Sequence, residues 1–348
     1  MRKQSWRFLL LPAIAAVLTA QGITPSDDAY HYKYWQNTPG LSVYTEWWYF
    51  NLYDAQQNLQ TVLVYFVTNP ADIGTIGLAP MLSVAYTPQG IDTNVDLYAT
   101  EAFSAAYDKA DVQLSGNLLH AVDANTYHLT GASLNGKMSW DLIYTRDGES
   151  FQGFNAAALG KQPWERMSWL AYMPRAHVTG QLTVNGKVST VDTYGYHDHN
   201  WGEWIPKDVL WNWAQYSQPG LWFDIYDIIG STGGNAHVHV SGQTYEFTSS
   251  QYQLMHTRWA YDSANHLYYP VETQFTADNG AARFAVTMNV LATDPLSFGF
   301  PYPVPEFIIY EQTTNYSGQV SVVDAAGNWQ TAAAFQGQGF KEYTAERQ

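Results

Sequence analysis

The sequence predicts an all-β protein, and three observations point to that class. From Tyr30 onward, short runs of strand-forming residues alternate with turn residues, as in 61–68. No long segment has the 3.6-residue periodicity of a helix. Asn-Gly pairs, which favour two-residue hairpin turns, follow strand-like runs at 135–136, 185–186 and 279–280. We therefore expect a strand-dense architecture of barrel or sandwich type.

The first 22 residues have the layout of a secretory signal peptide. Three basic residues precede the apolar run 8–18, and small residues follow it. The run contains Pro12 and is too short to span a bilayer comfortably. We therefore expect residues 1–22 to be removed and the mature protein to be secreted or otherwise exported, without stable membrane insertion.

The clearest hairpin spans 181–191 and turns at Asn185-Gly186. Its apolar and β-branched residues recur at alternate positions, which suits the half-buried faces of two paired strands. These residues are Leu182, Val184, Val188 and Thr190.

The charge balance restricts the classes of partner. The chain has 16 basic and 31 acidic residues, a formal charge of -15, and removal of residues 1–22 leaves 13 basic and 31 acidic residues, or -18. Nucleic acid and anionic lipid both require clustered Lys and Arg, so neither is expected as a partner. The chain has no cysteine, which excludes disulfides and thiol chemistry and leaves burial to hold the fold.

The segment 194–204 concentrates side chains that can carry chemistry, and Gly195 and Gly202 bracket its centre. We expect these glycines to let the backbone turn tightly. Two imidazoles and a carboxylate within three residues can exchange protons near neutral pH. In an extended strand, His197 and His199 would share one face, and Tyr196 and Asp198 the other. The alternative is structural: the polar groups close a loop and Trp201 fills a core.

A second candidate group is the aromatic run 44–50. As a strand it places Glu46, Trp48 and Phe50 on one face. The simple explanation is a core strand with Glu46 at its solvated end. The alternative is an acid facing an aromatic cavity, which would have a raised pKa.

Aromatic residues gather again in 211–215 and 221–227. Trp222, Asp224 and Tyr226 would share a strand face, and Trp213 belongs to the neighbouring run. Such rings either form core or bind an apolar or sugar ligand, and they can stabilise a carbocation. Asp224 is informative because an unpaired buried carboxylate is costly.

A metal site is a less favoured alternative. His237 and His239 have strand spacing and could join His197 and His199, but no standard zinc-ligand spacing occurs. We expect no metal and no cofactor. The serine-hydrolase elbow, the Walker loop and the dinucleotide fingerprint are all missing from the sequence.

One sequon, Asn315-Tyr316-Ser317, permits an N-linked glycan on Asn315 in a eukaryotic host.

Three motifs in order carry a resemblance to a known family: 46–50, 173–175 with the hairpin that follows it, and 195–202. Together they resemble the hydroxyneurosporene synthase or AttH-like family, which includes carotenoid hydratases and exported kievitone hydratase. The resemblance implies two lipocalin-like β-barrel domains packed side by side, with the ligand site near their junction. The implied division is a signal peptide at 1–22, an N-terminal domain at 23–193 and a C-terminal domain at 194–348.

The resemblance also implies an exported natural-product enzyme acting on a large apolar substrate of isoprenoid or polyketide type. Its reaction would be acid-catalysed hydration of a prenyl-type double bond. Alternatives are a cyclase or Diels-Alderase of the same fold, a non-catalytic lipocalin-like binder and, with less support, a sugar-active protein. The identity of the substrate and the choice between hydration and cyclisation remain open.

The family's Tyr-x-Asp pair matches Tyr196 and Asp198, and we expect protonated Asp198 to donate to the alkene. His197 or His199 would deprotonate the attacking water, and indole rings would shield the cation. The expected catalytic residues are Asp198, Tyr196 and His197. The expected substrate-binding residues are Glu46, Trp48, His199, Trp201, Trp213, Trp222 and Asp224.

Overall fold

The computed structural model describes residues 22–35, 44–71, 77–205, 208–231, 233–297 and 307–346. The expected signal peptide 1–22 lies outside these ranges except for its last residue. Within them the regular elements are strands and a few short 3-10 turns, namely η1 (Pro25–Asp28), η2 (Tyr32–Tyr34), η3 (Thr100–Ala102) and η5 (Ser249–Gln251). No described helix has the length and apolarity needed to cross a bilayer.

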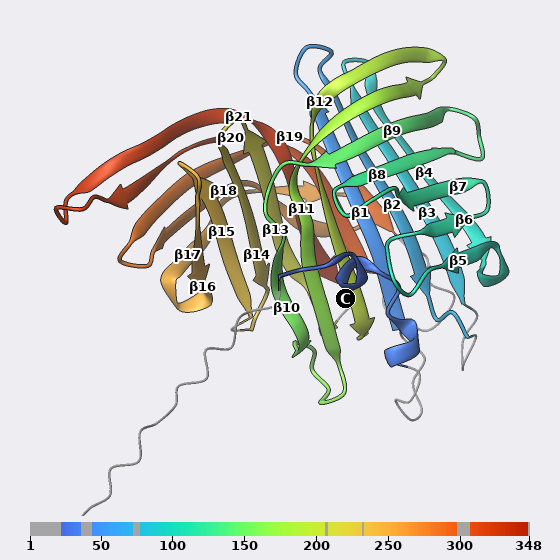
Figure 1. Cartoon of the computed structure of the whole chain (residues 1–348), viewed down its shortest axis with the longest axis horizontal. Helices are drawn as coiled ribbons and strands as arrows, with labels where there is room; N and C mark the ends of the chain where they lie inside the picture. The colour runs from blue at the N-terminus through green and yellow to red at the C-terminus, as the bar shows by residue number, and fades with distance from the viewer. Residues whose placement is uncertain are drawn as a thin grey trace, which may run out of the picture.

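The first sheet contains twelve antiparallel strands and curls into a nearly closed barrel (Figure 1). Its path runs β4-β3-β2-β1-β12-β11-β9-β8-β7-β6-β5, and β10 pairs with β11. Its strands are β1 (Tyr44–Asp54), β2 (Leu59–Thr68), β3 (Leu78–Thr87), β4 (Gly90–Ala99), β5 (Phe103–Ala105), β6 (Val112–Leu114), β7 (Asn117–Ala121), β8 (Thr126–Ala132), β9 (Met138–Arg146), β10 (Phe151–Ala158), β11 (Arg166–Val184) and β12 (Lys187–Glu203).

The second sheet contains nine strands and forms a half-barrel beside the first. Its order is β16-β15-β14-β13-β21-β20-β19-β18-β17. The predicted all-β fold with two lipocalin-like β-barrel domains side by side is confirmed, and the second barrel is only half closed. The strands are β13 (Trp211–Gln218), β14 (Leu221–Ile228), β15 (Gly234–Val240), β16 (Gln243–Thr248), β17 (Tyr252–Asp262), β18 (Leu267–Asp278), β19 (Ala282–Ser297), β20 (Phe307–Val323) and β21 (Trp329–Glu346).

The three Asn-Gly pairs turn hairpins as predicted. They connect β8 to β9, β11 to β12 and β18 to β19. Each glycine has a positive φ, at 70° for Gly136, 78° for Gly186 and 83° for Gly280, a conformation that is costly for other residues.

The change from one sheet to the other falls later than the division at 193/194. That division lies inside β12, which pairs with β1 from Tyr194 to Glu203 and with β11 over the same stretch. Residues 194–203 are therefore a central part of the first sheet. We place the boundary between Glu203, the end of β12, and Trp211, the start of β13.

Side-chain alternation divides the core into layers. One apolar cluster fills the first barrel and includes Trp48 and Phe50. A second lies between the two sheets and includes Tyr49, and a third, with Phe223 and Ile225, lies inside the half-barrel. The middle layer joins the sheets, because it contains residues of β1, β2, β13 and β14.

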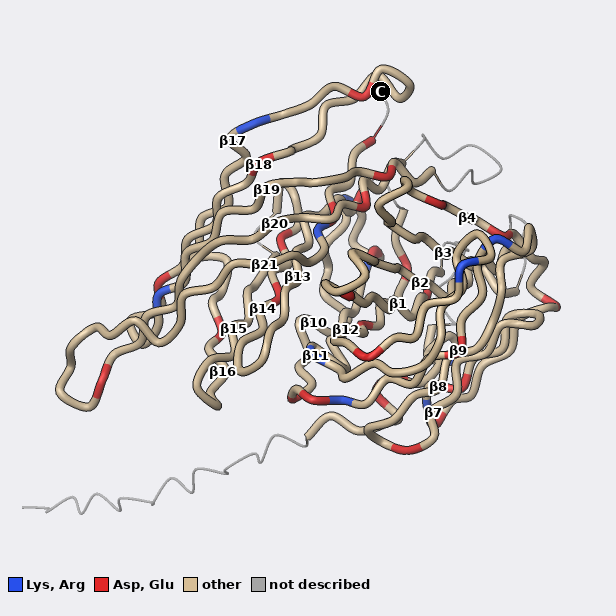
Figure 2. Tube along the Cα trace, turned by 90° about the horizontal axis from the view of Figure 1, so that it is seen from above, with Lys and Arg blue, Asp and Glu red and all other residues tan. Residues whose placement is uncertain are grey.

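Acidic residues are distributed over both sheets, and the few Lys and Arg residues are dispersed among them (Figure 2). This distribution agrees with the spread of charge along the sequence.

Gly195 and Gly202 do not make the turns that their bracketing positions led us to expect, because β12 continues through both. They instead allow neighbouring strands to approach. A Cβ at Gly195 would lie 2.2 Å from the Asn51 carbonyl oxygen, and one at Gly202 would lie 2.2 Å from the Arg166 carbonyl oxygen.

Gly195→Ala should therefore lower the free energy of unfolding by about 1 to 3 kcal/mol, since the atom it would strike belongs to a fixed strand backbone. Urea unfolding monitored by circular dichroism measures the change. Gly116→Ala is the matched control, because its added Cβ meets nothing within 4 Å. Equal stability of the two variants would contradict the close-approach explanation.

Candidate active site between the two sheets

The motif of β12 divides its side chains between two compartments. His197 and His199 point into the first barrel, where they pair in register with Phe50 and Trp48. Tyr196 and Asp198 point toward the second sheet. The split predicted from strand alternation is confirmed, and the imidazoles and the Tyr-x-Asp pair therefore occupy separate environments.

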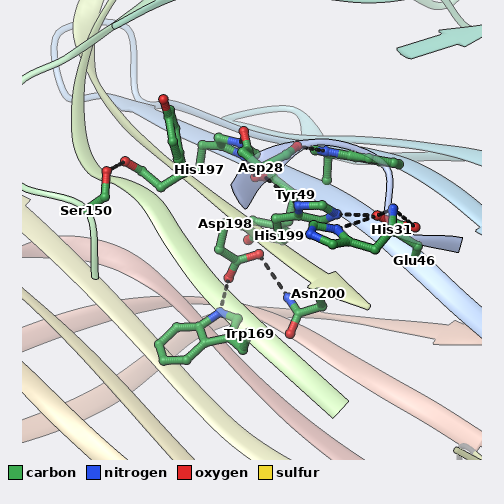
Figure 3. Close-up of polar contacts among 12 residues, drawn as sticks. Asp28, His31, Glu46, Tyr49, Ser150, Trp169, His197, Asp198, His199 and Asn200 are labelled. Atoms are coloured by element: carbon green, nitrogen blue, oxygen red, sulfur yellow. Dashed lines mark hydrogen bonds and ion pairs between the residues drawn. The ribbon is translucent and has the colours of Figure 1, made fainter. Parts of the chain in front are cut away.

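Asp198 is a buried acid at the junction of the sheets. Its Oδ2 accepts hydrogen bonds from the Tyr196 hydroxyl at 2.9 Å and the Trp169 indole nitrogen at 3.0 Å. Its Oδ1 accepts a longer bond of 3.2 Å from the Asn200 amide (Figure 3). Burial raises the pKa of Asp198 to about 7, although the hydrogen bonds from Trp169 and Tyr196 oppose the rise. Near neutral pH this carboxyl can hold and release a proton.

Asp224 supplies a second buried acid from β14. Burial raises its pKa well above the usual range, Tyr196 and Trp213 lower it, and the charge of Asp198 raises it further. Within the described ranges, neither carboxyl oxygen has a hydrogen bond of good geometry. Asp224 is therefore held as a neutral acid, with Tyr196 interacting with both carboxyl groups.

An apolar slot begins beside Asp198. Trp47, Tyr49, Trp211 and Glu342 line both the space beside Asp198 and a larger adjoining cavity. The larger cavity is narrow, with a volume of about 50 Å³. Its remaining wall is mostly apolar and includes Val64, Phe66, Leu82, Leu296, Phe307 and Ile309. The arrangement places an apolar space next to a buried carboxyl of raised pKa.

A chain of ion pairs fills the other side of β12, inside the first barrel. His199 lies between Glu46, at 2.8 Å from Nε2, and Asp28, at 3.2 Å from Nδ1. The second oxygen of Asp28 lies 3.0 Å from Nε2 of His197. Figure 3 shows how these four side chains face one another, and all four are fully buried.

Pairing shifts the pKa values of Asp28, Glu46 and His199 in the direction that favours their charged forms. Burial alone would lower the pKa of His199, but hydrogen bonds to Asp28 and Glu46 raise it. Burial alone would raise the pKa values of Asp28 and Glu46, but their histidine partners lower both. Because Asp28 comes from η1, these ion pairs fix segment 22–35 against the barrel interior, where Trp48 also donates to the Asp28 carbonyl at 3.0 Å.

Five expected site residues therefore lie away from Asp198. His197, His199, Glu46, Trp48 and Trp201 all face the first barrel and contact segment 22–35 or one another. Glu46 is neither the solvated strand end nor the acid of raised pKa that we considered. We correct the expected roles accordingly: these five side chains anchor the N-terminal segment, because strand alternation turns them from the cleft.

The structure does bring together Asp198, Tyr196, Asp224 and Trp213. The Trp213 ring lies 5.3 Å from those of Tyr49 and Tyr196. Trp222 shares the Asp224 face of β14 but stacks on Phe151 at 5.8 Å. Asn315 is half-buried in β20 between β19 and β21, and its glycosylation stays a prediction.

The four-histidine metal set is not assembled. His237 stacks on Phe151 at 3.8 Å, and His239 lies 3.0 Å from the Thr244 hydroxyl, both in the second sheet. A different group, His31, Glu46 and His199, has ligand atoms within 4.8 Å of one another and could hold a metal ion.

Sequence reasoning missed Asp28, Trp169, Glu311 and Glu342. Asp28 precedes every strand, and nothing local connects it to His197, 169 residues later. Trp169 belongs to a strand whose apolar residues all resemble core. Glu311 did carry a signal, since it directly follows the apolar run 307–310.

No protein-family model and no curated protein sequence matches this chain. Solved structures do. A candidate AttH from Nitrosomonas europaea is 16% identical, with a TM-score of 0.69 over 96% of this chain and 99% of that chain. Kievitone hydratase from Nectria haematococca is 16% identical, with a TM-score of 0.58 over 87% of this chain and 88% of that one. CghA with Sch210972 is 10% identical, with a TM-score of 0.58 over 88% of both chains. These likenesses establish a shared fold.

Asp28→Ala should lower the free energy of unfolding by about 3 to 5 kcal/mol, because it leaves two buried imidazoles without their shared carboxylate. Chemical denaturation measures the loss. Asp192→Ala is the matched control, since it removes a carboxylate from His177 at the surface, where the Asp192 side chain is 79% exposed. A small effect in both variants would contradict the anchoring role.

Asp198 should make the free energy of unfolding fall as the pH rises from about 4 to 7. The unfolded carboxyl ionises near 3.8 and the folded one near 7, so in this window the folded state holds a proton that the unfolded state has lost. The difference corresponds to roughly 4 kcal/mol. Urea titrations of the wild type and Asp198→Asn should show a shallower decline in the variant. Parallel pH profiles would show that Asp198 is not a neutral buried acid.

Proposed function

We propose that this chain is an exported enzyme that hydrates a prenyl-type double bond of a large apolar substrate, of isoprenoid or polyketide type, with Asp198 as the proton donor. The observation that carries the proposal is a buried carboxyl of pKa about 7 beside an apolar slot. An acid of this kind is protonated at neutral pH yet acidic enough to give up its proton. Export is part of the proposal and depends on residues 1–22.

The mechanism uses the residues of the cleft. The alkene π electrons take the proton of Asp198, forming a C–H bond at the less substituted carbon and a cation at the other. The rings of Trp169 and Trp213 stabilise that cation. Water then adds to the cation and returns a proton to the Asp198 carboxylate, which restores the acid. Tyr196 orients Asp198 through its hydrogen bond.

Neutral Asp224 has a supporting role. A second carboxylate next to Asp198 would oppose the negative charge that forms there when the proton is transferred. Because Asp224 stays protonated, that penalty is absent, and Tyr196 can interact with either acid. His197 and His199 take no step, since they lie on the other face of β12.

Two resemblances support hydration. The Tyr-x-Asp pair of carotenoid hydratases matches Tyr196 and Asp198, which the fold places together at the junction of the sheets. Kievitone hydratase, whose name states its reaction class, shares this fold. The reaction of hydroxyneurosporene synthase would be one specific case of the proposed hydration.

A cyclase is the second candidate, and the lining of the slot favours it. The wall is largely apolar, so an internal double bond or nucleophile could reach the cation where ordered water cannot. The same proton donor would begin both reactions. The products differ, because cyclisation leaves the mass of the substrate unchanged.

Asp198→Asn should lower kcat/KM by at least about 100-fold on any substrate that the wild type converts, since the amide cannot supply the proton. Isoprenoid polyenes and prenylated phenols, incubated in heavy-oxygen water and examined by mass spectrometry, form the test panel. Hydration adds one labelled water. The wild-type rate should fall as the pH rises through about 7, because the acid form of Asp198 is lost.

Asp192→Asn, at an exposed carboxylate, should keep wild-type activity. A mass-neutral product would favour the cyclase. Recovery of every bound compound unchanged would support a non-catalytic binder, and full activity of Asp198→Asn would remove Asp198 from the mechanism.

A further inference from the structure

A second pair of acids lies in the wall of the same slot. Glu311 on β20 and Glu342 on β21 are directly opposite each other in the strand register. Both line the apolar cavity beside Trp47, Tyr49 and Trp211. Glu311 is buried and Glu342 half-buried, so the pair is enclosed by the sheets but reaches the empty volume.

The two carboxyl groups act on each other, since Glu342 raises the pKa of Glu311, and two carboxyl groups that share a buried site retain a proton between them. Two donors hold the pair in place. The Tyr49 hydroxyl donates to Glu311 Oε1 at 3.2 Å, and the Trp211 indole nitrogen donates to Glu342 Oε2 at 2.7 Å. Burial raises the pKa values of both glutamates, that of Glu311 well above the usual range.

The pair forms no ion pair with Lys, Arg or His among the residues that the structure describes, although the charge of Lys341 lowers the pKa of Glu342. Lys341 is adjacent in sequence but follows the strand alternation to the other face of β21, where it donates to Gln312 Oε1 at 3.0 Å. A paired ion would have been the usual way to stabilise these acids. Instead they retain a proton and free acceptor positions toward the slot.

We propose that Glu311 and Glu342 bind a hydroxyl group of the substrate, so that the ligand of the slot is an apolar molecule with a neutral alcohol or phenol at one end. A hydroxyl donates one hydrogen bond and accepts others, which matches a carboxyl pair sharing one proton. An anionic group would meet negative charge there and is excluded. This inference rests on the proposed function and makes the pair a determinant of specificity.

The geometry also sets the position of the reacting bond. Trp47, Tyr49 and Trp211 line both the glutamate end and the space beside Asp198. Tyr49 connects the two ends, since its hydroxyl donates to Glu311 and its ring lies 6.2 Å from that of Tyr196. A substrate held by its hydroxyl at the glutamates therefore extends its apolar part toward the proton donor.

Binding of three probes tests the inference: decan-1-ol, its methyl ether and decanoate. Tryptophan fluorescence reports binding, because Trp47, Trp204 and Trp211 line the slot. The wild type should bind the alcohol at least about tenfold more tightly than the ether or the carboxylate, since only the alcohol both donates and accepts. The double variant Glu311→Leu/Glu342→Leu should lose this preference and bind alcohol and ether with similar affinity.

Glu246→Leu is the control, because Glu246 is exposed on β16 and should leave the preference intact. Equal binding of alcohol and ether by the wild type would overturn the inference even if the double variant did not fold. An unchanged preference in a folded double variant would also overturn it. Asp198→Asn should keep the preference while losing turnover, so failure of the proposed reaction and failure of this binding site give different results.

Discussion

The two-residue alternation of β12 is the constraint on which the rest of the molecule depends. The strand is paired along both edges, with β1 and β11, so none of its side chains can rotate to the other face. It is a wall with a barrel interior on one side and the inter-sheet cleft on the other. A shift of one residue in register would exchange the imidazoles for the Tyr196–Asp198 pair and place Asp198, the proposed proton donor, inside a filled barrel.

The two faces of this wall resolve the cost of buried charge in different ways. On the barrel side, His199 is fixed between Asp28 and Glu46, whose carboxylate oxygens lie 3.2 Å and 2.8 Å from its ring nitrogens. Each carboxylate therefore lies next to an imidazole of opposite charge. On the cleft side, Asp198 and Asp224 form no ion pair among the described residues. Their pKa values are raised, so protonation removes the cost of burying their charge. Ion pairs suit an anchor that must persist, whereas neutral acids suit a site that must release and recover a proton.

The sequence was sufficient for the features that local patterns determine. Strand alternation separated His197 from Asp198, and three Asn-Gly pairs located three hairpins. It was insufficient where partners come from distant strands. Nothing around Asp28 indicates that it meets His197 and His199, and without that partner the histidines resembled catalytic residues. The turns expected at Gly195 and Gly202 were wrong for a related reason. The sequence does not distinguish a glycine needed for the close approach of a neighbouring strand from a glycine needed for a turn.

The acids of the cleft also constrain what can occupy it. Asp198, Glu311 and Glu342 line two adjoining, mostly apolar spaces, and Asp224 is buried where it interacts with Asp198. None of the four forms an ion pair with Lys, Arg or His within the described residues. If stability alone had shaped this interface, apolar side chains of similar size would have served as well or better. Buried acids that retain protons, as Asp198, Asp224 and the Glu311–Glu342 pair do, are instead suited to chemistry on neutral, apolar molecules, because hydration or cyclisation of such a molecule begins with a proton.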